Sequence, residues 1–75
     1  MERYRNLGGD SGVAAYEIAA NSIKVQFNDG AVYLYTSQST GAANLAELQR
    51  LAAAGRGLNS FIGRVVRKMY AAKLN

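Results

Sequence analysis

Apolar and polar residues alternate through the centre of the chain. One alternating run covers residues 22–27, a second covers 31–36, and Asn28-Asp29-Gly30 separates them. A period of two is typical of β-strands, and Gly beside Asn or Asp between two such runs indicates a hairpin. The stretch from Val13 to Ile18 predicts a further strand before this hairpin. The first half of the chain therefore predicts three antiparallel strands.

The length of the hairpin loop decides which side chains face the core. A two-residue loop, Asp29-Gly30, turns Val32 and Leu34 inward. A three-residue loop turns Tyr33 and Tyr35 inward instead, because a shift of one residue moves every side chain to the other face. We expect the three-residue loop, since loops of this length commonly place Gly last in the left-handed conformation. This register also groups the aromatic rings with the β-branched residues of the preceding strand.

Helical spacing replaces the alternation after residue 40. Leucine and alanine recur three and four positions apart from Leu45 to Ala52, and Gly55 is a typical residue to end such a helix. Several residues before this segment or at its start have side chains that can cap a helix, because their oxygen atoms accept hydrogen bonds from the backbone N–H groups of the first turn. These candidate N-caps are Ser39, Thr40 and Asn44.

A second helix is predicted from Asn59, its expected N-cap, to Tyr70. Its apolar residues recur at positions i, i+3, i+4 and i+7, which indicates a stripe that faces the core. The stripe comprises Leu58, Phe61, Ile62, Val65, Val66, Met69 and Tyr70. Strands followed by helices predict an α+β fold, with a three-stranded antiparallel sheet followed by two helices packed on one face.

The order of these segments resembles a known family. The residues that carry the resemblance are Ser11, Val13, Tyr16, Ile23, Val25, Phe27, Gly30, Tyr33-Leu34-Tyr35, Leu48, Gly55 to Asn59 and Ile62. In this order they resemble the KTSC family, a short domain at the C-terminus of some lysyl-tRNA synthetases that also occurs as free-standing small bacterial proteins. The resemblance implies a single KTSC-like domain over residues 11–75. The activity of this family is unsettled. Its attachment to a tRNA enzyme suggests RNA binding.

The residues before this domain have a different character. Residues 1–10 are polar and end in the turn-forming sequence Leu7-Gly8-Gly9-Asp10. We expect them to form an N-terminal arm.

Basic side chains concentrate in the second half of the chain. Residues 1–37 carry three basic and four acidic side chains, a net charge of −1, whereas residues 38–75 carry six basic and one acidic, a net charge of +5. Such a division indicates a basic surface and a polyanionic partner, RNA or another polyanion. The residues expected to contact nucleic acid are Arg56, Arg64, Arg67, Lys68 and Lys73.

The spacing of these cations supports a common surface. Arg64, Arg67 and Lys68 are three and four positions apart, so a helix would place them on one face, opposite the apolar stripe. Arg56 precedes the same helix, whose first backbone N–H groups form a ready anion site. The alternative is an ordinary solvent-exposed helix face that happens to be basic.

The composition excludes several kinds of site. The chain has no Cys and no His, which removes disulfides, thiolate nucleophiles and the histidine ligands of metal centres. The five acidic residues are scattered, and no spacing pairs two of them for acid–base catalysis. No stretch approaches the roughly 20 apolar residues of a membrane span, and the N-terminus lacks a hydrophobic signal region. We therefore expect a cytoplasmic, non-enzymatic binding module without catalytic residues, metal, cofactor or membrane partner.

Two alternatives stay open at this level. Exposed tyrosines on a sheet stack against single-stranded bases, whereas in the expected register Tyr33 and Tyr35 belong to the core. A chain of 75 residues has a marginal core, and an unpaired edge strand at Val13–Ile18 would bind a second copy or the strand of a partner protein. A homodimer or protein-interaction module is therefore the alternative to RNA binding.

Overall fold

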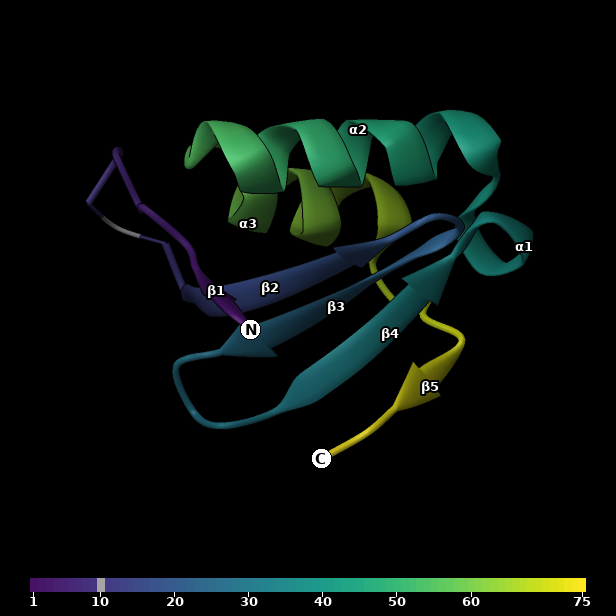
Figure 1. The fold of residues 1–75 in the computed structure, drawn as a ribbon, viewed down its shortest axis with the longest axis horizontal. Coiled ribbons are helices and arrows are strands. Elements are labelled where there is room, and N and C mark those ends of the chain that lie inside the picture. Colours follow the sequence, from purple (N-terminus) through teal and green to yellow (C-terminus); the bar gives the residue numbers. More distant parts are fainter. Residues whose placement is uncertain (10) are drawn as a thin grey trace.

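The fold is built on one antiparallel sheet whose strands lie in sequence order (Figure 1). The computed structural model describes residues 1–9 and 11–75. The strands are β1 (Glu2–Arg3), β2 (Val13–Ala19), β3 (Ser22–Phe27), β4 (Val32–Thr36) and β5 (Ala72–Lys73). The prediction of an α+β fold with an antiparallel sheet is confirmed, but the sheet has five strands rather than three. The pattern missed β1 and β5 because two residues are too few to show an alternation.

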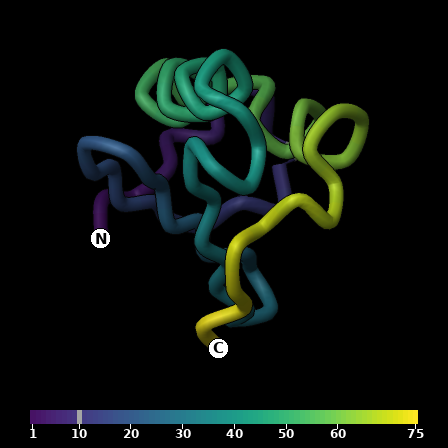
Figure 2. Tube along the Cα trace, turned by 90° about the vertical axis from the view of Figure 1, so that its right-hand side faces the viewer, coloured from purple at the N-terminus to yellow at the C-terminus, as the bar shows by residue number. Residues whose placement is uncertain are grey.

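Helices pack at one face and at one end of this sheet (Figure 1). They are α1 (Ser37–Thr40), α2 (Ala42–Ala54) and α3 (Leu58–Phe61), which continues into a π-helical segment, η1 (Ile62–Val66). The α2 helix and the α3–η1 segment lie together above the sheet, while the β3–β4 hairpin and the C-terminus extend away from them (Figures 1 and 2). The core consists of Tyr4, Val13, Ile23, Val25, Tyr35, Leu45, Leu48, Ala52, Leu58, Ile62 and Val66.

The β3–β4 hairpin has the expected three-residue loop. The register pairs Val25 with Tyr33, and the N–H of Gly30 donates to the carbonyl oxygen of Phe27 (2.9 Å). Gly30 has a φ of +93°, which suits glycine because it has no Cβ. The register turns Tyr35 into the core, where it is only 1 % exposed, and leaves Tyr33 half-buried on the same face.

The caps of the first helices differ from those predicted. Thr36 caps α1, since its Oγ1 accepts from the N–H of Ser39 and the Ser39 Oγ accepts from the N–H of Thr36, both at 3.0 Å. This reciprocal pair is a capping box, in which Ser39 is the third helical residue rather than the cap. Gly41 precedes α2, so neither Thr40 nor Asn44 caps it.

The second helix is shorter than the predicted span from Asn59 to Tyr70. Gly57, not Asn59, is its N-cap, and the helical segment ends at Val66. Arg67 has a φ of +40°, outside the helical region. Its N–H donates to the carbonyl oxygen of Ile62 (2.6 Å), an i→i−5 bond that closes the π-helical turn.

Competition with the sheet explains why this helix stops. The chain returns to the edge of β4, where the N–H of Ala71 donates to the carbonyl oxygen of Leu34 (2.6 Å) and β5 follows. A helix continued to residue 70 would carry the chain away from that edge. The predicted core stripe is therefore broken, and two of its members, Val65 and Met69, are 41 % and 47 % exposed.

The first residues take part in the fold rather than projecting from it as an arm. Glu2–Arg3 pair with β2, and the N–H of Tyr4 donates to the carbonyl oxygen of Ala14 (3.0 Å). The Tyr4 side chain lies in the core and is 3 % exposed. Asp10, the last residue of the expected arm, lies outside the described residues. The outer edge of β2 is consequently covered over part of its length.

Two glycines provide a matched test of this backbone. Gly55 ends α2 with a φ of +79°, as its position in the sequence predicts, and a Cβ there would lie 2.8 Å from the Cβ of Arg5. We expect Gly55→Ala to lower the free energy of unfolding by about 1–2 kcal/mol or more, because the left-handed conformation strains any residue with a Cβ. Urea denaturation followed by circular dichroism measures the change.

Gly63 is the control. It lies inside η1, and a Cβ there would meet no atom within 4 Å. Gly63→Ala should be neutral or stabilise the fold by up to about 1 kcal/mol, because alanine loses less backbone entropy in a helical segment. Equal losses for both variants would contradict the assigned end of α2.

Candidate nucleic-acid interface

The five candidate cations lie in four parts of the fold. Arg56 occupies the loop between α2 and α3, Arg64 lies on η1, and Lys73 lies on β5. Arg67 and Lys68 follow η1 directly. All five are exposed. The prediction that Arg64, Arg67 and Lys68 share one helix face is wrong, because the helical segment ends before the last two.

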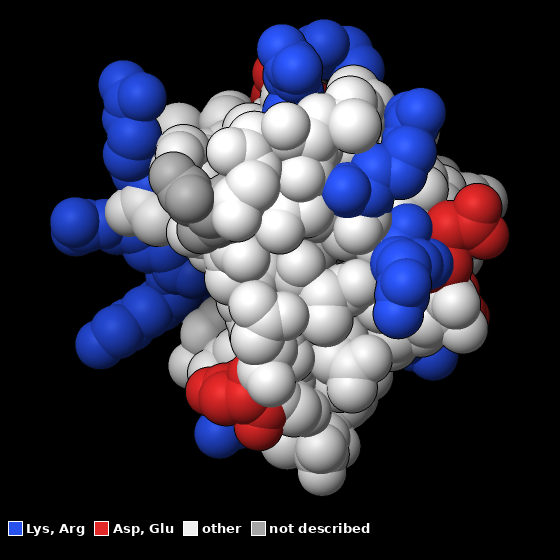
Figure 3. All heavy atoms as spheres, turned by 90° about the vertical axis from the view of Figure 1, so that its left-hand side faces the viewer, with Lys and Arg blue, Asp and Glu red and all other residues white. Residues whose placement is uncertain are grey.

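Ion pairs occur elsewhere on the surface. In residues 1–9 and 11–75, Lys24 pairs with Glu17 (Nζ–Oε2 3.8 Å) and Arg50 pairs with Glu47 (Nη2–Oε2 2.5 Å). None of the five candidate cations has an ion pair within this part of the chain. Figure 3 shows Lys and Arg side chains that project at its left, and basic and acidic side chains that adjoin at its right and at its lower left.

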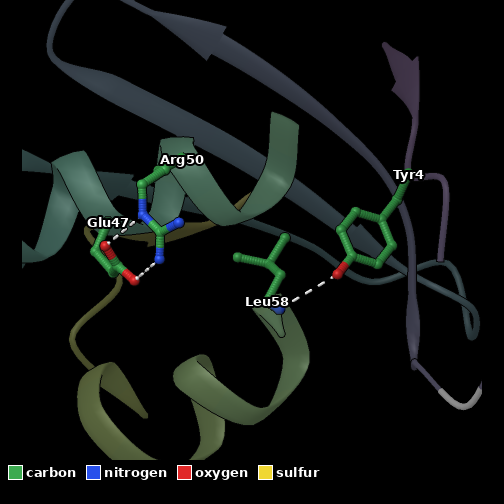
Figure 4. A network of polar contacts seen from close by, with 4 residues as sticks. All are labelled: Tyr4, Glu47, Arg50 and Leu58. Atoms are coloured by element: carbon green, nitrogen blue, oxygen red, sulfur yellow. Dashed lines mark hydrogen bonds and ion pairs between the residues drawn. The ribbon is translucent and has the colours of Figure 1, made fainter. Parts of the chain in front are cut away.

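The Arg50–Glu47 pair shows how an acidic neighbour occupies the hydrogen-bond donors of a basic side chain. Both lie on α2, and Arg50 donates from Nε to Oε1 (2.9 Å) as well as from Nη2 to Oε2 (Figure 4). These hydrogen bonds lower the pKa of Glu47 and raise the pKa of Arg50. A guanidinium held by two carboxylate oxygens has fewer donors left for a phosphate.

The C-terminal end of η1 forms a groove with a mixed lining. A cavity of about 740 Å³ lies between the exposed apolar side chains of Val65 and Met69 and the cations Arg67 and Lys68. The Nε of Arg67 donates to the carbonyl oxygen of Gly63 (3.0 Å), which folds this side chain back along η1. The turn after η1 therefore brings two of the candidate cations together beside an apolar surface.

Arg56 lies at the opposite end of the α3–η1 segment. It lines a smaller cavity of about 210 Å³ with Asn59 and Ser60. The N–H of Leu58, the first residue of α3, donates to the hydroxyl oxygen of Tyr4 (3.3 Å, Figure 4). One of the N–H groups predicted to face an anion is thus satisfied within the protein.

Lys73 lies beside a cluster of aromatic rings. Its Nζ is 5.9 Å from the centroid of the Tyr33 ring. Tyr33 packs against Tyr70 with ring centroids 4.7 Å apart, and Tyr70 meets Tyr35 edge-on at 6.3 Å. Burial raises the pKa of the Tyr35 hydroxyl to about 12, and the neighbouring tyrosines contribute. The C-terminal segment thus places one cation and one ring against the hairpin.

Two other kinds of site find no support in the described part of the chain. Residues 1–9 and 11–75 contain no group of three or more acidic, His or Cys side chains arranged to hold a metal ion. None of their helices combines the length and the apolar character needed to span a bilayer.

The sequence alone did not reveal the apolar lining of the groove. Val65 and Met69 fitted the predicted core stripe, and the prediction took no account of Gly63, which precedes them. Gly63 lowers helix propensity, as do the β-branched residues around it. Together they are a local signal for an early end of the helix.

No family model, curated protein or solved structure matches this chain. The resemblance to the KTSC family stays a prediction that rests on the residues quoted for it. The function must therefore be inferred from the fold and the surface.

The Tyr4 hydroxyl provides a test of how the N-terminal residues hold α3 in place. Tyr4→Phe leaves the N–H of the buried residue Leu58 without its partner. We expect a loss of about 1–2 kcal/mol in the free energy of unfolding, because an unsatisfied buried donor costs its desolvation. Urea denaturation measures the loss. Tyr16→Phe, at a half-buried position, is the control, and a similar loss there would contradict the role of the hydrogen bond.

Alkaline unfolding tests the burial of Tyr35. Its pKa is raised from 10.0 to about 12 in the folded protein, so the neutral side chain contributes stability that is complete below pH 10. That contribution, about 2–3 kcal/mol, disappears as the pH rises from 10 to 12. Tyr35→Phe removes the ionisation, so the free energy of unfolding should fall less steeply over this window. If the free energy of unfolding of Tyr35→Phe varied with pH as it does in the unaltered protein, the raised pKa of Tyr35 would be contradicted.

Proposed function

We propose that the protein is a small, non-enzymatic module of the KTSC type that binds a polyanion, RNA rather than DNA. The choice of RNA rests on the family resemblance. The inference that the ligand is a polyanion rests on the charge distribution. The observation that carries the proposal is that Arg56, Arg64, Arg67, Lys68 and Lys73 are exposed and have no ion pair within the described residues.

The charge distribution favours a polyanion over a small acidic ligand. The candidate cations occur before, on and after the α3–η1 segment, and one more lies on β5. Such spacing suits a chain of phosphates better than a single carboxylate, since each cation can neutralise a different charge. Arginine adds bidentate hydrogen bonds to phosphate. Contacts of this kind position the ligand and carry no base sequence by themselves.

Salt dependence tests this proposal. The affinity for a fluorescein-labelled single-stranded RNA of ten nucleotides is measured by anisotropy between 50 and 300 mM NaCl. Each neutralised phosphate contributes about 0.7 to the slope of log Kd against log salt concentration. The double variant Arg64→Gln, Arg67→Gln should reduce the slope by about 1.4 and weaken binding.

The matched control removes the same charge from the two paired positions. The double variant Lys24→Gln, Arg50→Gln lowers the net charge equally, but both residues already have acidic partners. It should leave the slope close to that of the unaltered protein. Absence of binding at 50 mM NaCl, or equal effects of the two double variants, would sink the proposal.

A protein partner is the second candidate function, and one observation favours it. Exposed Val65 and Met69 line the groove beside η1, and such side chains are typical of docking surfaces. The strand at Val13–Ile18 was expected to offer an unpaired edge to a partner strand. Part of that edge is occupied, because β1 pairs with Ala15 and Tyr16.

The charges around the groove indicate which partner it would accept. Arg67 and Lys68 line it, so two copies meeting through this surface would bring like charges together. An acidic partner with an apolar anchor is therefore favoured over a homodimer. Sedimentation velocity across protein concentrations at low salt should show a monomer, and a dimer disrupted by Met69→Gln would contradict that preference.

A further inference from the structure

The hairpin end of the sheet carries aromatic rings that are only partly buried. The register across the strands aligns Tyr16, Val25, Tyr33 and Lys73 in one row on the face that carries the helices. The β3–β4 hairpin extends away from the helices (Figure 1). Val25 is fully buried, whereas Tyr33 is half-buried and Lys73 is exposed. The row therefore runs from the core to a partly open surface.

A cavity of about 440 Å³ opens at this end of the sheet. Its walls include the rings of Phe27 and Tyr33, which meet edge-on with centroids 5.7 Å apart. Gly12 and Ala31 also line it, and because glycine has no side chain and alanine only a methyl group, they leave the space beside the rings open. The volume is in the range of small-molecule sites, and aromatic walls are suited to a flat ring.

The polar groups at the cavity suit a base rather than a phosphate. Asn28 and Asp29 line it, and the Asp29 Oδ1 accepts from the N–H of Ala31 (3.0 Å). A carboxylate repels a phosphate but accepts hydrogen bonds from the amino group of a base, and asparagine both donates and accepts. Of the candidate cations, Lys73 is paired with the lining residue Tyr33 across β4 and β5. Its Nζ lies 5.9 Å from the centroid of the Tyr33 ring, so a positive charge is available beside one wall of the cavity.

We propose that this cavity binds one unstacked base of a single-stranded RNA against the side chains of Phe27 and Tyr33, with Lys73 contacting an adjacent phosphate. The inference deepens the proposed function and rests on it. Bases in a duplex are stacked and paired, so they cannot enter without paying for unstacking. The protein consequently prefers single strands to duplexes. Base–aromatic contacts are sequence-tolerant, since every base has a π-face.

The experiment compares two RNAs and two variants. The unaltered protein is titrated into a labelled ten-nucleotide single strand and into the duplex of the same sequence, at equal salt. The single strand should bind at least fivefold more tightly. Tyr33→Leu, which removes one ring, should weaken binding of the single strand by about tenfold. Ala31→Leu, which fills the cavity and keeps both rings, should weaken it similarly. Neither variant should change the salt slope.

The controls separate loss of the site from loss of the fold. Tyr16→Leu removes another half-buried ring from the same row, at the far side of the sheet, and should change affinity less than twofold. Circular dichroism and urea denaturation establish that each variant is folded. Ala31→Leu keeps the test valid if Tyr33→Leu does not fold, because the Ala31 backbone hydrogen bonds are retained.

The outcomes distinguish the two proposals. Equal affinities for single strand and duplex, with no effect of Ala31→Leu, would overturn the base site while salt-dependent binding keeps the proposed function. Binding of neither RNA at low salt would overturn the proposed function, and the base site with it. Upfield shifts of the Phe27 and Tyr33 ring protons on titration with the single strand would support the site directly.

Discussion

The three-residue loop of the β3–β4 hairpin determines which side of β4 packs against the helices. Gly30 accepts the positive φ that this loop requires, and a shift of one residue would reverse every side chain of the strand. The register buries Tyr35 at the centre of the core and sets Tyr33 in line with Lys73. Both the core and the aromatic cavity therefore depend on one backbone conformation at one glycine.

A second constraint is the return of the chain from η1 to the sheet. Residues after Val66 leave the helix and bond along the outer edge of β4, where the N–H of Leu74 donates to the carbonyl oxygen of Val32 (2.7 Å). These hydrogen bonds replace those that further helical turns would have made. The change of direction requires the π-helical turn and the positive φ of Arg67, and both are backbone conformations of less favourable energy than an α-helix. The return separates cations that a continuous helix would have aligned.

The sequence predicted the elements that depend on local chemistry. The glycine of the hairpin loop indicated its register, and Gly55 indicated the end of α2, because both positions need a conformation that other residues avoid. Contacts between distant segments were not predictable in this way. The Tyr4 hydroxyl accepts a hydrogen bond from the N–H of Leu58, 54 positions along the chain. No local sequence pattern near either residue predicts that contact. Of the candidate site, exposure of the cations followed from their charge, but their arrangement depended on where the second helix stopped.

The segment from Arg67 to Lys73 joins the two parts of the proposed binding surface. Its first residues form the basic side of the groove beside η1, and Lys73 lies beside the ring of Tyr33, which lines the aromatic cavity. Tyr70, between them, packs against Tyr33, which holds the segment to the sheet. The cations supply attraction that weakens with salt, whereas contact with the rings depends on a base being free to leave its stack. The proposed ligand, a flexible single strand, satisfies both requirements at once, whereas a duplex satisfies only the first.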